Sequence, residues 1–136
     1  MNIEFKEYKT YHEKEILKLY KSVEWSNYYK NPEMLKSAYN NSLFVLGAYF
    51  KEELIGIIRV VGDGYSIVYI QDIIVDPEFQ RKNIGSNLIK KILEKFSKVY
   101  QIILSTDDTK KTVGFYEKMG FRKFSDLGLT TFFKTN

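Results

Sequence analysis

The chain has 136 residues, of which 44% are hydrophobic and 28% are charged, and its formal net charge is +4. This length and composition predict one folded domain over residues 1–136 with a substantial apolar core, and they argue against disorder. The absence of cysteine excludes disulfides, a cysteine nucleophile and thiolate metal sites, and the single histidine, His12, excludes a multi-histidine metal site. We therefore expect no bound metal.

The first half of the chain alternates strand-like and helix-like patterns. Residues 3–8 predict a short strand, and residues 11–23 carry apolar side chains at helical spacing. The pair Asn31 and Pro32 marks the start of a second helix. Between the two helices, residues 25–31 are expected to form an aromatic, polar loop.

The middle of the chain predicts a hairpin and then a central strand. Residues 43–50 and 54–64 are apolar runs joined by a short charged turn, and glycines at 62 and 64 mark the next turn. Residues 66–75 are apolar on both faces, which is typical of a strand inside a sheet.

The last third predicts a helix over residues 84–98, a strand over 100–106 and a further helix with Thr109 as its N-cap and Gly120 as its C-terminal cap. Residues 121–134 are expected to close the chain as a hairpin. Early helices, a β-meander and a final β-α-β unit predict an α/β (α+β) fold, with a mixed sheet and helices on both faces.

The segment DPEFQRKNIGSNL, residues 76–88, joins the central strand to the next helix. A helix N-terminus presents unpaired N–H groups and a positive dipole end, and successive N–H groups of a turn can surround phosphate oxygens. Small, turn-tolerant and cationic residues gather here: Arg81, Lys82, Asn83, Gly85 and Ser86. The segment predicts a pyrophosphate site; the alternative is a connector in which these residues only satisfy turn geometry.

The stretch QRKNIGS after IIVDPEF resembles the acetyl-CoA loop of the GNAT acetyltransferases, whose pattern is Q/R-x-x-G-x-G/A. Gln80 and Gly85 fit the pattern, Ser86 follows its last position, and Asn83 stands where the family usually has glycine. Asparagine also enters left-handed backbone space, so we expect this departure to cost little.

A second stretch, FYEKMGF at residues 115–121, resembles the late helix and following strand of the family, at the usual spacing. The family often has asparagine where Thr109 lies and alanine where Thr112 lies. The resemblance covers nearly the whole chain. LYKSVEWSNYY and YIQDIIVDPEFQ are similar to a bacterial branch that acetylates small amines.

The resemblance implies acetyl-CoA as co-substrate and a GNAT-like, mostly antiparallel sheet with a splayed middle strand. In the family, that strand carries a bulge, which would free N–H groups around residues 73–75 for the thioester. The residues implied to hold the co-substrate are Ile73, Ile74, Val75, Gln80, Arg81, Lys82, Asn83, Ile84, Gly85, Ser86, Thr109 and Tyr116.

Two residues are candidates for proton transfer. Tyr116 matches the frequent tyrosine acid of the family, which protonates the departing thiolate; alternatively it is one of eleven tyrosines and merely packs. Asp72 is the candidate base, because we expect it to share a strand face with Val68, Ile70 and Ile74, where apolar surroundings would raise its pKa.

Asp72 could instead have a structural role, and a water ordered by Tyr69, Gln71 or Glu24 could then accept the amine proton. For the acceptor, Trp25, Tyr28 and Tyr29 could form an aromatic wall that binds an amine through cation–π contacts. The same aromatic residues could equally be core residues that anchor a loop.

These observations predict an N-acetyltransferase that moves an acetyl group from acetyl-CoA to a primary amine of a small molecule, by direct transfer in a ternary complex. The alternatives are a protein N-terminal or lysine acetyltransferase, and a CoA-binding sensor or interaction module without catalysis. No signal peptide or apolar run of about 18 residues is present, so we expect a cytoplasmic protein without a membrane partner. Its lysines are dispersed, so we expect no nucleic-acid partner. The late hairpin could pack in a homodimer or cover the site.

Overall fold

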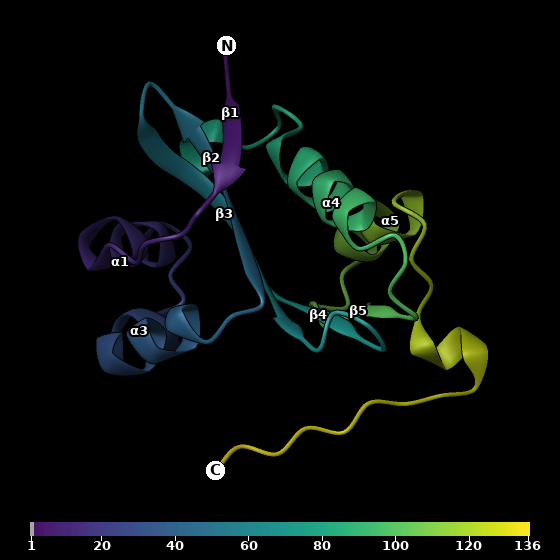
Figure 1. Ribbon diagram of the computed structural model, residues 1–136. Helices are drawn as coiled ribbons and strands as arrows, with labels where there is room; N and C mark the ends of the chain where they lie inside the picture. The colour runs from purple at the N-terminus through teal and green to yellow at the C-terminus, as the bar shows by residue number, and fades with distance from the viewer. Residues whose placement is uncertain (1) are drawn as a thin grey trace. The chain divides into compact units, whose positions relative to one another are not determined.

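A mixed five-stranded sheet forms the centre of the fold (Figure 1). In this computed structural model, which describes residues 2–136, the strands lie in the order β1-β2-β3-β4-β5. The first four strands are antiparallel to their neighbours, and β4 and β5 are parallel. The fold class predicted from the sequence, a mixed and mostly antiparallel sheet with helices, is confirmed.

The elements follow one another in this order: β1 (Glu4–Glu7), α1 (Glu13–Ser22), α2 (Ser26–Tyr29), α3 (Pro32–Asn40), β2 (Phe44–Phe50), β3 (Glu53–Gly62), β4 (Val68–Val75), the 3₁₀ helix η1 (Pro77–Phe79), α4 (Ile84–Lys95), β5 (Ile102–Leu104), α5 (Lys110–Lys118) and the 3₁₀ helix η2 (Phe124–Leu127). The chain divides into two compact units, Met1–Ser105 with the whole sheet and Thr106–Asn136 with α5 and η2. The single domain over residues 1–136 stays a prediction.

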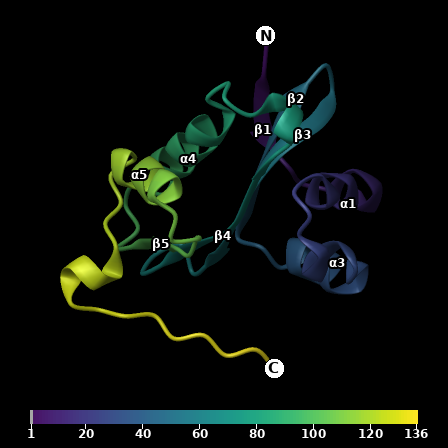
Figure 2. The ribbon, with the colours of Figure 1, turned by 180° about the vertical axis from the view of Figure 1, so that it is seen from behind.

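Helices cover both faces of the sheet within the first unit. On one face, α1 and α3 bury Ile16 and Leu35 against Ile57 of β3. On the other face, α4 buries its apolar stripe, and Ile84 at its start lies against Gly56, the neighbour of Ile57 in β3. Figures 1 and 2 show α1 and α3 on one side of the strands and α4 on the other.

A β-bulge at Gln71 interrupts the pairing of β3 with β4. Arg59 is the partner of Asp72, whereas Val60, the next residue of β3, is the partner of Ile70, so Gln71 is the extra residue. Since adjacent residues of a strand face opposite sides of a sheet, Asp72 and Ile70 lie on opposite faces. The prediction that Asp72 shares a face with the preceding apolar residues of its strand is therefore wrong; it shares one with Ile74 only, because the bulge shifts the alternation.

The predicted hairpin over residues 121–134 is also wrong. Residues 124–127 form η2, and no strand occurs among the described residues that follow it. Gly128 takes the left-handed conformation at φ 74°, and the Leu129 N–H donates to the Phe124 carbonyl at 2.9 Å, which directs the chain away from a hairpin. The side chains of Phe132 and Phe133 are 92% and 89% exposed as a result.

Smaller differences concern element ends. Residues 26–29 form the single turn of α2 inside the expected loop, and α4 ends three residues before the predicted position. The strand expected over residues 100–106 is limited to the three residues of β5. The predicted starts of α4 and α5 are confirmed. The Thr109 side chain caps α5, whereas Asn83 precedes α4 in the left-handed conformation without a side-chain capping hydrogen bond.

Gly56 is expected to be indispensable for the contact between β3 and α4. A Cβ atom there would lie 3.3 Å from the Ile74 carbonyl oxygen and 3.4 Å from Cγ2 of Ile84. Gly56→Val should lower the free energy of unfolding by about 1–3 kcal/mol through overpacking. Gly114→Ala is the control, because a Cβ at Gly114 meets nothing within 4 Å; equal stability of the two variants in urea titrations would contradict this account of the packing.

Candidate functional site

The loop before α4 has an unusual backbone. Arg81 and Asn83 both take the left-handed conformation, at φ 64° and φ 62°, and Asn83 is the N-cap residue of α4. The expectation that Asn83 would enter left-handed space is confirmed. Arg81 has the same conformation, which is uncommon for a long side chain and which no local pattern predicts. Two left-handed residues so close together turn the chain sharply into the helix.

The six N–H groups of residues 81–86 have no hydrogen-bond acceptor among the described residues. The first N–H that enters the helix pattern belongs to Asn87, which donates to the Asn83 carbonyl at 3.0 Å. Arg81 and Lys82 are exposed, and neither forms an ion pair with another described residue. A continuous run of free donors at the positive end of a helix, next to two unpaired cations, suits an anionic group.

Gly85 has no structural reason to be a glycine within its own unit. It lies in the first turn of α4, and an added Cβ would meet only Cγ2 of Val75, at an ordinary 3.9 Å. A glycine inside a helix is about 1 kcal/mol less favourable than alanine. A residue without a side chain at this position leaves the backbone open to the close approach of a ligand.

The second half of β4 has an open edge. Residues 68–70 pair with β5, whereas no described residue extends this ladder to residues 71–75. This is the splay that the family resemblance implied. Gln80, from the loop, donates from its Nε2 to the Val75 carbonyl at 3.1 Å and so joins the loop to the end of the open strand.

Two of the three N–H groups predicted to serve the thioester point to this edge. The Asp76 N–H donates to the Ile55 carbonyl of β3 at 2.8 Å, and bonding alternates along an antiparallel pair. The N–H groups of Ile73 and Val75 therefore point away from β3, and that of Ile74 points toward it. The open edge and the free amides of residues 81–86 thus belong to one continuous stretch of chain.

Asp72 lies in a buried ion pair. Its side chain is almost fully buried, and its Oδ2 accepts hydrogen bonds from Arg59 Nε and from the Tyr20 hydroxyl, each at 2.8 Å. A carboxylate held in this way suits the structural role better than that of a base. Its Oδ1 is also buried and has no partner among the described residues.

The Asp72 cluster extends to a second tyrosine. The hydroxyls of Tyr20 and Tyr39 lie 2.8 Å apart, and Arg59 Nη1 donates to Ser42 Oγ at 3.2 Å. Burial raises the pKa of Tyr20 and of Tyr39 well above the usual phenol value, so both hydroxyls remain donors. Tyr20 and Tyr39 are not predictable from the sequence as members of this cluster, since buried tyrosines in helices give no signal that separates them from ordinary core residues.

The predicted aromatic wall is only partly assembled. The rings of Trp25 and Tyr28 have centroids 6.0 Å apart, and Tyr20 lies against both of them. The Tyr28 hydroxyl accepts a hydrogen bond from Nε2 of Gln71, the bulge residue, at 3.2 Å. The Tyr29 ring has a different partner, since Lys21 Nζ lies 5.9 Å from its centroid in a cation–π contact. The structure therefore brings Tyr28 to the bulge, with Trp25 against Tyr28, but it shows no contact of Tyr29 with either ring.

The remaining two predicted residues lie in the second unit. The Thr109 Oγ1 accepts from the Thr112 N–H at 3.3 Å, which confirms it as the N-cap of α5. At the other end, the Phe121 N–H donates to the Tyr116 carbonyl at 3.1 Å, and Gly120 is left-handed at φ 98°. The ring of Phe121 lies edge-on to that of Tyr116, at 5.9 Å, so this C-terminal cap orients the tyrosine.

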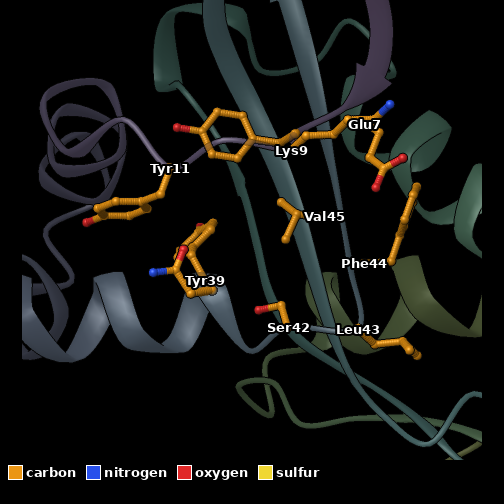
Figure 3. Close-up of a pocket in the computed structure, with 10 residues that line it drawn as sticks. Glu7, Lys9, Tyr11, Tyr39, Ser42, Leu43, Phe44 and Val45 are labelled. Carbon is orange, nitrogen blue, oxygen red and sulfur yellow. The ribbon is translucent and has the colours of Figure 1, made fainter.

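A separate pocket of about 220 Å³ lies between the end of α3 and the β1–β2 edge (Figure 3). Tyr11 and Tyr39 line one side of it and Glu7 and Phe44 the other, with Val45 between them. None of the predicted site residues lines it. Among residues 2–136, no group of three or more His, Asp or Glu side chains is arranged to hold a metal ion, and no helix is long and apolar enough to cross a bilayer.

Comparison with known proteins agrees with this geometry. The family model of the GNAT acetyltransferase domain matches residues 7–130. A solved GNAT-family acetyltransferase from Streptococcus pneumoniae is 40% identical, with a TM-score of 0.90 over 99% of this chain and 98% of that one. The PaiA N-acetyltransferase of Thermoplasma acidophilum, solved in complex with coenzyme A, shares the fold at 19% identity, with a TM-score of 0.69 over 90% of this chain and 91% of that one.

Curated relatives match shorter segments. A glucosamine 6-phosphate N-acetyltransferase from Trypanosoma brucei brucei is 36% identical over 61 residues, 43% of this chain and 40% of that protein. An N-alpha-acetyltransferase 30 from Dictyostelium discoideum is 35% identical over 86 residues, 59% of this chain and 46% of that protein. The matches span less than half the length of these relatives. The domain match, which covers most of the chain, and the bulged, open β4 together establish that the chain belongs to the GNAT family of acetyltransferases.

Proposed function

We propose that the protein transfers an acetyl group from acetyl-CoA to a primary amine of a small molecule, directly and in a ternary complex. The observation that carries this proposal is the run of six free N–H groups at residues 81–86, continuous with the open edge of β4. In a member of the GNAT family, this is the arrangement that a diphosphate followed by a thioester requires.

The residues of the loop fit coenzyme A chemically. The free amides of residues 81–86 would hold the diphosphate, and Arg81 and Lys82 would add charge at its rim. Bound acetyl-CoA would supply the activated acetyl group. The N–H groups of Ile73 and Val75 would donate to the pantetheine arm and to the thioester carbonyl, whose oxygen gains negative charge when the amine attacks.

The amine must lose a proton before or during the attack. An alkylamine with a pKa of about 10.4 is only roughly 0.04% neutral at pH 7. Asp72 is committed to Arg59 and Tyr20, so we assign no base role to it. Gln71, which is exposed at the bulge, is the better candidate to order a water that takes this proton.

The departing thiolate must gain a proton. Tyr116 remains our candidate for this acid, on the resemblance of FYEKMGF to the family. Burial, with a smaller contribution from the Asp107 carboxylate, raises the pKa of Tyr116, so its hydroxyl stays protonated at neutral pH. In the balanced step, the neutral amine nitrogen bonds to the acetyl carbon, the carbon–sulfur bond breaks, and the sulfur takes the tyrosine proton. The nitrogen then sheds one proton as it becomes the amide, and this proton restores the tyrosine hydroxyl.

The acceptor is proposed to be small because Trp25 and Tyr28 lie against each other beside the bulge, which suits a compact organic cation. The relatives named for glucosamine 6-phosphate and for protein N-termini point to different acceptors, so an assay panel needs both classes. A protein acetyltransferase would prefer the peptides of that panel. A CoA-binding module without catalysis would bind CoA and turn over nothing.

Gly85→Glu should weaken CoA binding about a hundredfold or more, which corresponds to about 2.7 kcal/mol, because a carboxylate would stand beside the phosphates. Isothermal titration calorimetry with CoA measures this. Ser97→Glu, which adds the same charge on an exposed residue beyond the other end of α4, should bind as the wild type does. Unchanged affinity of Gly85→Glu would remove the loop from the CoA site.

Tyr116→Phe should lower kcat about a hundredfold while the affinity for CoA stays within about twofold, since only proton donation is lost. Thiol release from acetyl-CoA reports the rate at the optimum pH. Tyr100→Phe is the matched control, because that ring is 84% exposed. Equal rates for the Tyr116 variant and the wild type would exclude Tyr116 from the chemistry.

Trp25 provides a direct probe of the acceptor side, because it is the only tryptophan of the chain and is 37% exposed. In the presence of CoA, a small amine that is acetylated should change the tryptophan fluorescence in a saturable way. The panel should contain arylalkylamines, polyamines, aminoglycosides and short peptides. A response to peptides alone would favour protein acetylation, and turnover without any fluorescence change would show that the acceptor binds away from Trp25.

A further inference from the structure

A buried polar cluster lies on the α1–α3 face of the sheet, directly beside the bulge. Its members come from four elements that are far apart in the sequence: Tyr20 of α1, Tyr39 of α3, Arg59 of β3 and Asp72 of β4. All four side chains are less than 9% exposed. The proposed chemistry uses none of them, so their arrangement needs a separate explanation.

The contacts of this cluster converge on one atom. Asp72 Oδ2 accepts from Arg59 Nε and from the Tyr20 hydroxyl, while Asp72 Oδ1 has no partner among the described residues. Since the Tyr20 hydroxyl donates to Asp72, the hydrogen between the two tyrosines comes from Tyr39. Tyr20 and Arg59 are thus the two hydrogen-bond donors that hold the Asp72 side chain.

Asp72 directly follows the bulge residue. Gln71 is the extra residue of the ladder, and its side chain is hydrogen-bonded to Tyr28. A bulge leaves its strand free to shift register unless neighbouring side chains fix it. Fixing the Asp72 side chain on the α1 face therefore fixes the position of Gln71 and the direction of the open edge that follows.

Tyr20 contacts both the aromatic wall and Asp72 of the open strand. Its ring centroid lies 5.4 Å from that of Tyr28 and 6.0 Å from that of Trp25, and its hydroxyl holds Asp72. One side chain therefore touches the proposed acceptor wall with its ring and the open strand with its oxygen. Tyr28 also reaches β4 with its hydroxyl, but at the bulge residue Gln71 and not at the carboxylate of Asp72.

The energetics of buried ion pairs support a role beyond stability. The desolvation free energy of two buried charges offsets much of the free energy of their attraction. Apolar replacements of such pairs are therefore often neutral or stabilising. A buried pair is best explained where it fixes one arrangement among several. Here the arrangement is the register of β4 at its bulge.

We infer that Tyr20 is a positioning residue. Together with Arg59 it holds the Asp72 side chain, and this contact fixes the bulge at Gln71. The fixed bulge in turn aligns the acceptor wall, formed by Trp25 and Tyr28, with the open edge of β4. The inference rests on the proposed acetyl transfer for its kinetic consequence. Its structural consequence, a locally fixed β4, does not depend on that function.

The test compares Tyr20→Phe with Tyr8→Phe. Each removes the hydroxyl of a buried tyrosine, but the Tyr8 hydroxyl accepts from the His12 N–H in a partly buried hydrogen bond and does not reach β4. In Tyr20→Phe, amide hydrogen exchange at Asp72 and Ile74 should accelerate about tenfold relative to the amides of β2. In Tyr8→Phe, the ratio should stay at the wild-type value.

Kinetics provide the second readout, with the amine from the panel that the wild type acetylates best. Tyr20→Phe should raise the KM for that amine about tenfold and leave the KM for acetyl-CoA within about twofold. If the wild type acetylates no compound of the panel, the proposed function fails while the exchange ratio still decides the inference. An unchanged exchange ratio in folded Tyr20→Phe overturns the inference, whatever the kinetics.

If Tyr20→Phe does not fold, the double variant Arg59→Met and Asp72→Leu decides the question. It replaces the buried pair with apolar side chains and avoids an unpaired charge. The inference expects a folded protein with faster exchange at position 74 and a raised KM for the amine. A folded double variant with wild-type exchange and wild-type KM values would overturn it.

Discussion

The bulge at Gln71 is the constraint on which the rest of the structure depends. One extra residue in β4 reverses the faces of the residues on its two sides, so that apolar side chains pack under α4 before it and Asp72 meets α1 and α3 after it. The same irregularity coincides with the end of the β4–β5 ladder. At its start β4 is paired on both sides, with β3 and with β5, whereas at its end, among the described residues, it is paired with β3 alone and has one free edge.

The two halves of the proposed site follow from this strand and the turn after it. The free edge of β4 offers N–H groups to a ligand. Further unpaired N–H groups follow in the turn, which contains two left-handed residues, and in the first turn of α4. Helix packing keeps that turn in place, because Ile84 is buried against the glycine at position 56. Backbone N–H donors therefore follow one another along this stretch of chain, and that matches the proposed ligand, which is made of phosphates and a carbonyl.

Local signals in the sequence are sufficient to predict most of the helices and strands. Caps and turn residues predicted the starts of α4 and α5, and apolar patterns predicted the sheet, because both depend on neighbours within a few residues. The bulge was implied only by family resemblance, since an extra residue in a strand leaves no periodic mark. For the same reason the face of Asp72 was predicted wrongly. Its partners Tyr20 and Arg59 lie 52 and 13 residues away, beyond any local pattern.

The spare room at position 85 has an evolutionary consequence. Stability alone would favour alanine there, because a helix gains from it and nothing in the first unit obstructs it. A population selected only for heat resistance, with no need for catalysis, should therefore lose this glycine early. Deep mutational scanning with separate selections for growth and for thermal stability would then favour glycine at position 85 in the first selection and alanine in the second. Such a result would identify a position where ligand binding and helix stability require different residues.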